Sequence, residues 1–277
     1  MDVKKMLAVG TAIIGTVAMA DIVSSSVVGY LGNDMNASGA TMAAGSFATV
    51  TANDGSLTLA DFSVSGYDAP EWNEEDEEWT GGCPGGRFNV QFLNSSGVTE
   101  ASYYWIDNGE VAAGWYASSS AKAIDGGAES VKIAAGQAMW IIGRGYKLTS
   151  AGAVNEEDIA YVTRSSGATA IGNSTPINHT LAKLTVSGYS APVWNEDDEE
   201  YTGGCPGGRF NIQFLTTSGT TEASYYWIDN GEVAPGWYSS SSAKPIEGGA
   251  ASVEIPAGKG MWIIGRGLTL SIPAPEL

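Results

Sequence analysis

Short runs of alternating apolar and polar residues predict that this chain is built from β-strands. Phe88, Val90 and Phe92 alternate with polar residues, so a strand would place all three on one face, and residues 210–214 repeat the pattern. The unbroken apolar run at 138–142 is typical of a central strand. Roughly five to seven such strands per repeat, with no amphipathic helix, predict an all-β fold that is either sandwich-like or barrel-like.

The strand pattern occurs twice, because residues 66–145 recur as residues 188–267 at a constant offset of 122. The two copies are identical at 63 of their 80 aligned positions. A fixed period of this kind indicates a tandem repeat in which each copy forms one structural unit. A weaker echo, SGAT at 38–41 and again at 166–169, extends the repeat upstream with a shift of six residues.

An Asn-Gly pair predicts a hairpin inside each copy. Asn108-Gly109 separates the run SYYWI from the run EVAAGWY. Asn-Gly tolerates the positive φ angles of a tight turn, so we expect the two runs to pair as antiparallel strands.

The first residues have the pattern of a secretory signal peptide, with Lys4-Lys5, an apolar run at 6–17 and the cleavage site Ala18-Met19-Ala20. The apolar run is shorter than the roughly 20 residues that a membrane helix needs, and no later stretch is long or apolar enough to span. We therefore expect no membrane span and a secreted or cell-surface protein. The predicted division is a signal peptide at 1–20, a first β-repeat domain with an N-terminal strand at 21–150 and a second β-repeat domain at 151–277.

The strand-like segment Ile22 to Tyr30 begins almost at the expected new N-terminus. Two partners are open to it. It pairs either with the edge of a neighbouring subunit, which would hold subunits together, or with a strand of its own subunit.

The chain carries 31 Asp and Glu residues against 13 Lys and Arg, a formal net charge of −18. Such a charge repels nucleic acid and excludes it as a partner, while favouring cations and basic partners. Charged residues make up only 16% of the chain, and many of the acids lie in two runs. These runs therefore need an explanation of their own.

Each acidic run lies between two aromatic residues, as in Trp72 to Trp79. In an extended loop, alternate carboxylates point to one side and can converge on a hard cation such as Ca²⁺, which takes six to eight oxygen ligands. The alternatives are a solvated acidic loop and, less favoured, a catalytic carboxylate pair. The candidate calcium ligands are Asn73, Glu74, Asp76, Glu78, Asn195, Glu196, Asp198 and Glu200.

Cys83 and Cys205 are the only cysteines, and they occupy the same place in the two copies. In an exported protein, two thiols favour a disulfide. The bridge would join the two repeats of one chain or link two chains, and the third possibility is that both thiols are free. No C-x-x-C pair is present, which argues against a zinc site.

Four tryptophans, Trp105, Trp115, Trp227 and Trp237, are candidates for a glycan-stacking face. Adjacent strand positions point to opposite faces, so about half of the aromatic residues in these runs belong in a core. The other interpretation is that these rings serve packing alone. His179 is the only histidine and has no counterpart in the other copy, so we expect it in a loop and without a catalytic role.

The stretch SSSVVGY at Ser24 to Tyr30 and the pattern IPAGKGMWIIGRG at Ile255 to Gly267, echoed at 133–145, resemble those of uncharacterised exported bacterial β-repeat proteins. The resemblance implies export and a β-repeat architecture, and it implies no activity.

No constellation of catalytic residues is evident, so we expect a protein without enzymatic activity. The near-perfect repeat and the N-terminal strand favour a structural role, as a self-associating subunit of an extracellular filament, sheath or surface layer that calcium stabilises. The alternative is a carbohydrate-binding or adhesion module with a glycan as partner.

Overall fold

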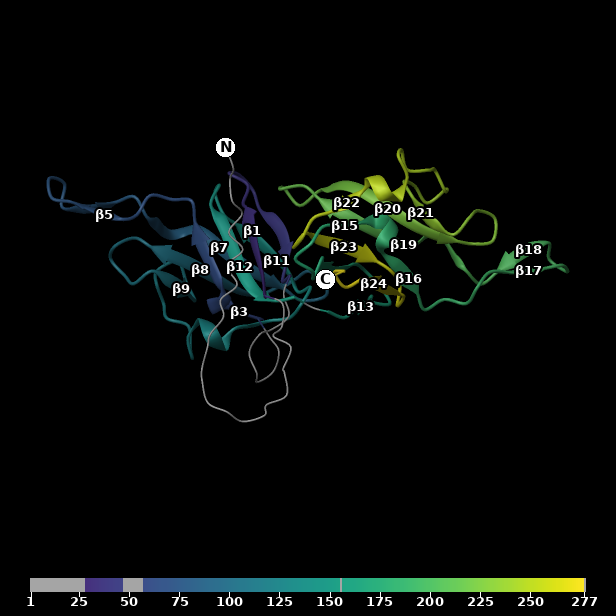
Figure 1. Cartoon of the computed structure of the whole chain (residues 1–277), viewed down its shortest axis with the longest axis horizontal. Coiled ribbons are helices and arrows are strands. Elements are labelled where there is room, and N and C mark those ends of the chain that lie inside the picture. Colours follow the sequence, from purple (N-terminus) through teal and green to yellow (C-terminus); the bar gives the residue numbers. More distant parts are fainter. Residues whose placement is uncertain (1–27, 47–56, 155, 277) are drawn as a thin grey trace, which may run out of the picture.

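The computed structural model describes residues 28–46, 57–154 and 156–276, and within them the fold is all-β, as predicted (Figure 1). The predicted signal peptide and residues 21–27 lie outside the described residues. None of the described helical segments is long and apolar enough to cross a membrane. The helical segments are 3₁₀ turns: η1 (Leu59–Asp61), η2 (Ala128–Ser130), η3 (Leu181–Lys183) and η4 (Ala250–Ser252).

The first repeat contains a five-stranded and a three-stranded antiparallel sheet. The five-stranded sheet has the order β2 (Thr41–Ala44), β11 (Ala138–Ile142), β7 (Cys83–Leu93), β8 (Thr99–Asp107), β9 (Gly114–Tyr116). The three-stranded sheet has the order β1 (Val28–Asp34), β12 (Lys147–Ala153), β4 (Phe62–Ser65). Two further strand pairs are β3 (Leu57–Thr58) with β10 (Lys132–Ile133), and β5 (Glu71–Asn73) with β6 (Glu78–Thr80).

The second repeat has the same sheets in the same order. Its five-stranded sheet is β14 (Thr169–Gly172), β23 (Gly260–Ile264), β19 (Cys205–Leu215), β20 (Thr221–Asp229), β21 (Gly236–Tyr238). Its three-stranded sheet is β13 (Ile159–Val162), β24 (Thr269–Ile272), β16 (Thr185–Ser187). The remaining pairs are β15 (His179–Thr180) with β22 (Glu254–Ile255), and β17 (Val193–Asn195) with β18 (Glu200–Thr202).

A hydrophobic core fills the space between the two sheets of each repeat. In the first repeat, Phe88, Val90 and Ile141 of the larger sheet pack against Val64 and Leu148 of the smaller one, and each is at most 6% exposed. Burying an apolar side chain of this size contributes roughly 1.5–3 kcal/mol. The alternating apolar residues of β7 lie on one face, as predicted. Strand β11 pairs with β2 on one side and β7 on the other, as predicted for a central strand. The strand order of each sheet is open, so each repeat is sandwich-like.

The repeat also extends upstream as the weaker echo predicts. Strands β2 and β14 occupy equivalent edges of the two larger sheets and begin 128 residues apart, at Thr41 and Thr169. Strands β3 and β15 begin 122 residues apart, at Leu57 and His179. The shift of six therefore falls between these two pairs of strands. The predicted boundary at 150 falls within β12, which ends at Ala153, and the next strand begins at Ile159.

The described part of the N-terminal segment pairs within its own chain. Strand β1 runs antiparallel to β12 in unbroken register from Val28 opposite Ala153 to Asp34 opposite Lys147. Donation of Val28 to Tyr30 to a neighbouring subunit is therefore not what this structure contains, because those residues already have a partner strand. Residues 22–27 of the segment lie outside the described residues.

The hairpin predicted at Asn108-Gly109 forms, but its turn is longer than a tight two-residue turn. Strands β8 and β9 pair as expected, with Trp105 opposite Trp115, and residues 108–113 connect them. The side-chain oxygen of Asn108 accepts hydrogen bonds from the backbone N–H groups of Glu110 and Val111 at 3.1 and 3.3 Å. This local bonding holds the chain in a wider turn, since an Asn side chain competes with strand pairing for backbone groups.

The two repeats join where β2 and β14 meet. Met42, Leu93 and Ala138 of the first repeat form one buried cluster with Ala170 and Leu215 of the second. Backbone hydrogen bonds cross the joint reciprocally: the Ala44 N–H donates to the Gly258 carbonyl at 2.9 Å and the Gly172 N–H donates to the Gly136 carbonyl at 3.2 Å. Each repeat therefore covers the edge strand of the other, which would otherwise expose unpaired backbone groups.

The joint offers a matched pair of glycine substitutions. Gly97 and Gly219 are equivalent turn residues with φ of +77° and +82°, so an alanine causes similar backbone strain at both. A Cβ at Gly97 would lie 1.7 Å from the ring of Trp262, whereas one at Gly219 would lie 3.9 Å from Trp140. We expect Gly97→Ala to lower the free energy of unfolding by about 1–3 kcal/mol more than Gly219→Ala does, measured by denaturant titration. Equal losses would contradict this packing.

Candidate functional site

Each repeat extends one β-hairpin away from its sandwich. Hairpin β5–β6 lies at one end of the long axis of the molecule and hairpin β17–β18 at the other (Figure 1). Almost every residue of these four strands is exposed. An isolated two-stranded hairpin is marginally stable in water, so local contacts must hold each one.

An aromatic pair holds each hairpin. Trp72 and Trp79 lie opposite one another across β5 and β6, with ring centroids 5.6 Å apart in an edge-to-face arrangement. Trp79 also covers the backbone of Gly109, where a Cβ would lie 2.1 Å from the ring. Trp194 and Tyr201 repeat the pair at 5.1 Å. Between 40% and 49% of each of these four side chains stays exposed, which leaves a large aromatic surface uncovered at both ends.

The acidic runs form the turns at the tips of the hairpins. The Asn73 side-chain oxygen accepts a hydrogen bond from the Glu75 N–H at 3.0 Å, and its amide group donates to the Asp76 carboxylate at 2.7 Å. Glu77 then adopts a left-handed conformation with φ of +53°, which reverses the chain. The second tip repeats these bonds between Asn195, Asp197 and Asp198. The acidic run is therefore a tight turn fixed by the asparagine, and not the extended loop that the calcium hypothesis assumed.

This turn changes the geometry on which the calcium hypothesis rests. Within the described ranges, no group of three or more His, Cys, Asp and Glu side chains is placed to hold a metal ion. Of the predicted ligands, Asn73 bonds to Asp76 and Asn195 bonds to Asp198. The other four are exposed carboxylates on the tips: Glu74, Glu78, Glu196 and Glu200. Calcium binding stays a prediction, and it requires carboxylates to move or two tips to share one ion.

Two of the predicted glycan-stacking tryptophans are core residues. Trp115 is 8% exposed and its indole N–H donates to the Phe62 carbonyl at 3.0 Å. Trp237 is similarly buried and donates to the Leu184 carbonyl at 3.2 Å. Their ring faces are covered by the sandwich, so the packing interpretation holds for both and a glycan cannot stack on them.

The other two, Trp105 and Trp227, are half-buried and held by a hydrogen-bonded chain. The Trp105 indole donates to the Tyr67 hydroxyl at 2.8 Å, and that hydroxyl donates to the Asp107 carboxylate at 3.1 Å. Burial is the main cause that raises the pKa of Tyr67 to about 12, so it stays a neutral donor. Trp227 repeats the arrangement with Tyr189 and Asp229.

Of the large aromatic side chains in the described ranges, those of Trp72, Trp79, Trp194 and Tyr201 are the most exposed. The sequence contained a signal for them: aromatic residues seven positions apart on either side of a turn.

His179 is buried in strand β15 and does not lie in the expected loop. Its Nε2 lies 2.8 Å from the hydroxyl of Thr175, which in turn bonds to the side-chain oxygen of Asn173 at 2.7 Å. Burial is the main cause that lowers the pKa of His179, and nearby Lys183 lowers it further. The imidazole is therefore a neutral part of the packing.

The two cysteines are free, and the predicted disulfide is not formed. Cys83 belongs to the core of the first repeat and Cys205 to the core of the second, each fully buried. The two sulfurs lie in separate cores, one in each repeat, and are not bonded to one another.

We expect both thiols to be unreactive in the folded protein. Burial raises the pKa of Cys83 to about 12 and that of Cys205 to about 11 from the usual 9.0. The higher pKa of Cys83 lowers the fraction of its thiol that is ionised at neutral pH by about three orders of magnitude. Thiol titration of unreduced protein should detect almost no reaction until guanidinium is added, and then two thiols per chain. If no thiol reacts even after unfolding, the cysteines are oxidised and the disulfide hypothesis is correct.

Comparisons with known proteins give no family for this chain. No protein-family model, curated protein or solved structure matches it. A functional assignment therefore depends on its own residues, and above all on the exposed aromatic hairpins.

Proposed function

We propose that this protein is an exported, non-enzymatic structural protein that associates with copies of itself in an extracellular filament, sheath or surface layer. The observation that supports this best is the pair of equivalent aromatic hairpins at opposite ends of the molecule (Figure 1). The signal-peptide pattern of residues 1–20 supports export.

Exposed tryptophans on a projecting hairpin favour a contact with another protein surface. Large aromatic side chains bury 150–250 Å² each and dominate interface energies when a partner covers them. Trp72 and Trp194 are each almost half exposed, although the fold has room for tryptophans in its cores. Little of the surface of the hairpin strands is buried within the chain, so their aromatic pairs are accessible to a neighbouring subunit.

The number and placement of the hairpins favour a linear assembly. A subunit with one contact surface forms dimers, whereas a subunit with two surfaces at opposite ends extends into a chain or layer. The joint at β2 and β14 holds the two hairpins apart, so both are accessible at once.

The charge of the tips favours dependence on a cation. Each tip carries five adjacent carboxylates, Glu74 to Glu78 in the first repeat and Glu196 to Glu200 in the second. Two such tips repel each other unless a counterion lies between them. Ca²⁺ binds carboxylate oxygens from several loops at once, so ligands from two subunits can complete a site that one tip lacks.

Removing the exposed aromatic residues should stop assembly. We expect the double variant Trp72→Ser/Trp194→Ser to remain monomeric where the unchanged chain polymerises, because each lost contact weakens association by about 2 kcal/mol or more. Either single variant retains one intact hairpin and should not grow beyond a dimer. Light scattering and negative-stain microscopy with calcium measure both.

The matched control is Val162→Ser, which removes an apolar side chain that is 72% exposed but lies outside the hairpins. It should assemble like the unchanged chain. Circular dichroism should show that every variant is folded. If the unchanged chain is monomeric at all concentrations, with and without calcium, the proposed function fails.

Calcium should stabilise the assembled state through the tip carboxylates. Millimolar Ca²⁺ should raise the melting temperature, by about 2–4 °C for each kcal/mol of binding free energy. The variant Glu74→Gln/Glu78→Gln/Glu196→Gln/Glu200→Gln keeps the asparagine turns and should lose this shift. If calorimetry detects neither heat of Ca²⁺ binding nor a rise in melting temperature, the calcium hypothesis is contradicted and the tips are solvated turns.

A further inference from the structure

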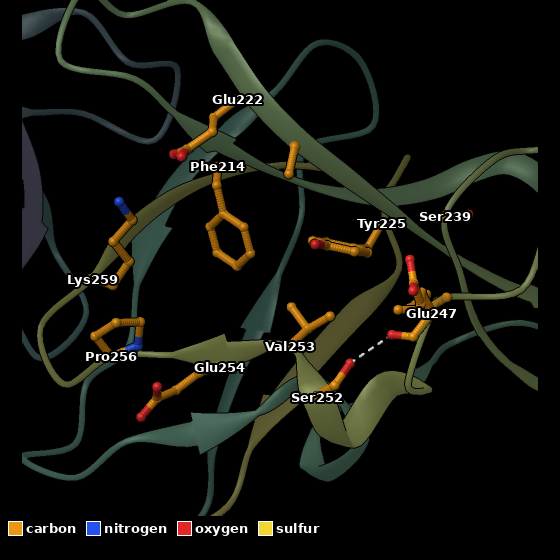
Figure 2. Close-up of a pocket in the computed structure, with 12 residues that line it drawn as sticks. Phe214, Glu222, Tyr225, Ser239, Glu247, Ser252, Val253, Glu254, Pro256 and Lys259 are labelled. Atoms are coloured by element: carbon orange, nitrogen blue, oxygen red, sulfur yellow. Dashed lines mark hydrogen bonds between the residues drawn. The ribbon is translucent and has the colours of Figure 1, made fainter.

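Each sandwich also contains a groove at the end of its core, apart from the hairpins. In the second repeat it lies between the inner face of β19 and β20 and the segment 246–256, and encloses about 600 Å³ (Figure 2). Phe214 and Tyr225 form one wall and Val253 lies opposite (Figure 2). The first repeat has the equivalent groove, of about 450 Å³. These volumes are in the range of small-molecule binding sites.

Each groove continues toward the joint between the repeats. Glu222 and Lys259 line both the large groove and a second cavity of about 330 Å³, which reaches Thr41 and Met42 of the first repeat. In the first repeat the equivalent residues, Glu100 and Gln137, line two adjoining cavities in the same way. Two adjoining cavities make an elongated site, which suits a linear ligand better than a compact one.

The groove offers an aromatic wall and polar groups of both kinds. Tyr225 turns its hydroxyl toward the cavity, while the Glu222 carboxylate and the Lys259 ammonium group lie at its rim (Figure 2). Within the part of the chain that the structure describes, no hydrogen bond or ion pair engages these three polar groups. A hydrogen-bond acceptor, a donor and a hydroxyl therefore flank one apolar surface, as recognition of a polyhydroxylated ring requires.

The two copies differ more around the groove than elsewhere. Of the twelve positions that line the second groove, five differ from the first copy, against twelve of the other 68 aligned positions. The walls are unchanged and the differences lie mainly at the rim: Ala117/Ser239, Asp125/Glu247, Lys132/Glu254, Ala134/Pro256 and Gln137/Lys259. A constant wall with a varied rim indicates one class of ligand bound with two different preferences.

We propose that these two grooves are binding sites for a neutral linear polysaccharide. The net charge of −18 and the glutamates at the rim disfavour an acidic glycan. An extended peptide usually adds a strand to an open sheet edge, whereas the walls of this groove are the side chains of Phe214, Tyr225 and Val253. A neutral sugar fits this groove, because its ring can pack on tyrosine and its hydroxyls can donate and accept hydrogen bonds. This site is independent of assembly through the hairpins.

Isothermal titration with defined hexasaccharides tests the proposal. The neutral probes are cellohexaose, laminarihexaose and mannohexaose, and the acidic probe is hexagalacturonate. We expect at least one neutral probe to bind with two sites per chain and the acidic probe not to bind. Tyr225→Ala should remove one site, and Tyr103→Ala/Tyr225→Ala should weaken binding by about tenfold or more.

Three control variants distinguish binding in the grooves from binding elsewhere on the chain. Glu100→Gln/Glu222→Gln changes only exposed side chains, so it should weaken binding without affecting folding. Trp72→Ser/Trp194→Ser removes one exposed aromatic ring from each hairpin and should leave glycan affinity unchanged. Glu254→Lys/Lys259→Gln gives the second groove the rim charges of the first and should make the two sites equal. The proposal is overturned if no neutral probe binds, if hexagalacturonate binds as tightly, or if the double tyrosine variant keeps full affinity.

Discussion

The reciprocal covering of β2 and β14 is the constraint on which the arrangement of the molecule depends. Each is the edge strand of a five-stranded sheet, and unpaired backbone groups at such an edge invite pairing with another chain. Hydrogen bonds from Ala44 to Gly258 and from Gly172 to Gly136 engage both edges within one chain. With the repeats joined in this way, the two aromatic hairpins lie at opposite ends of the molecule (Figure 1).

Tryptophan has two distinct roles in this fold. Trp115 and Trp237 pack within the sandwiches, and each donates its indole N–H to a backbone carbonyl because an unpaired buried N–H would cost free energy. Trp72 and Trp194 each pack edge-to-face against the aromatic residue opposite and stay nearly half exposed. Each pair holds its hairpin, yet nearly half of Trp72 and Trp194 stays uncovered, which is why these residues carry the proposal of self-association.

The grooves and the hairpins lie in different parts of each repeat and depend on different residues. A structural subunit that also binds a neutral polysaccharide would connect an extracellular assembly to a glycan matrix. The duplicated unit supplies two copies of each surface, so avidity would strengthen the proposed attachment without any new contact.

The sequence by itself determined the all-β fold, the two repeats and the strands with clear alternation, because side-chain period and near-identity of the copies are local properties. It did not determine the turn at the acidic tips, where the Asn73 side chain fixes a reversal that carboxylate spacing does not reveal. Nor did it show that Cys83 and Cys205 lie in separate cores, that His179 is buried, or which tryptophans are exposed. Those features were decided by tertiary structure, because burial and proximity depend on which sheet face, and which repeat, covers each residue.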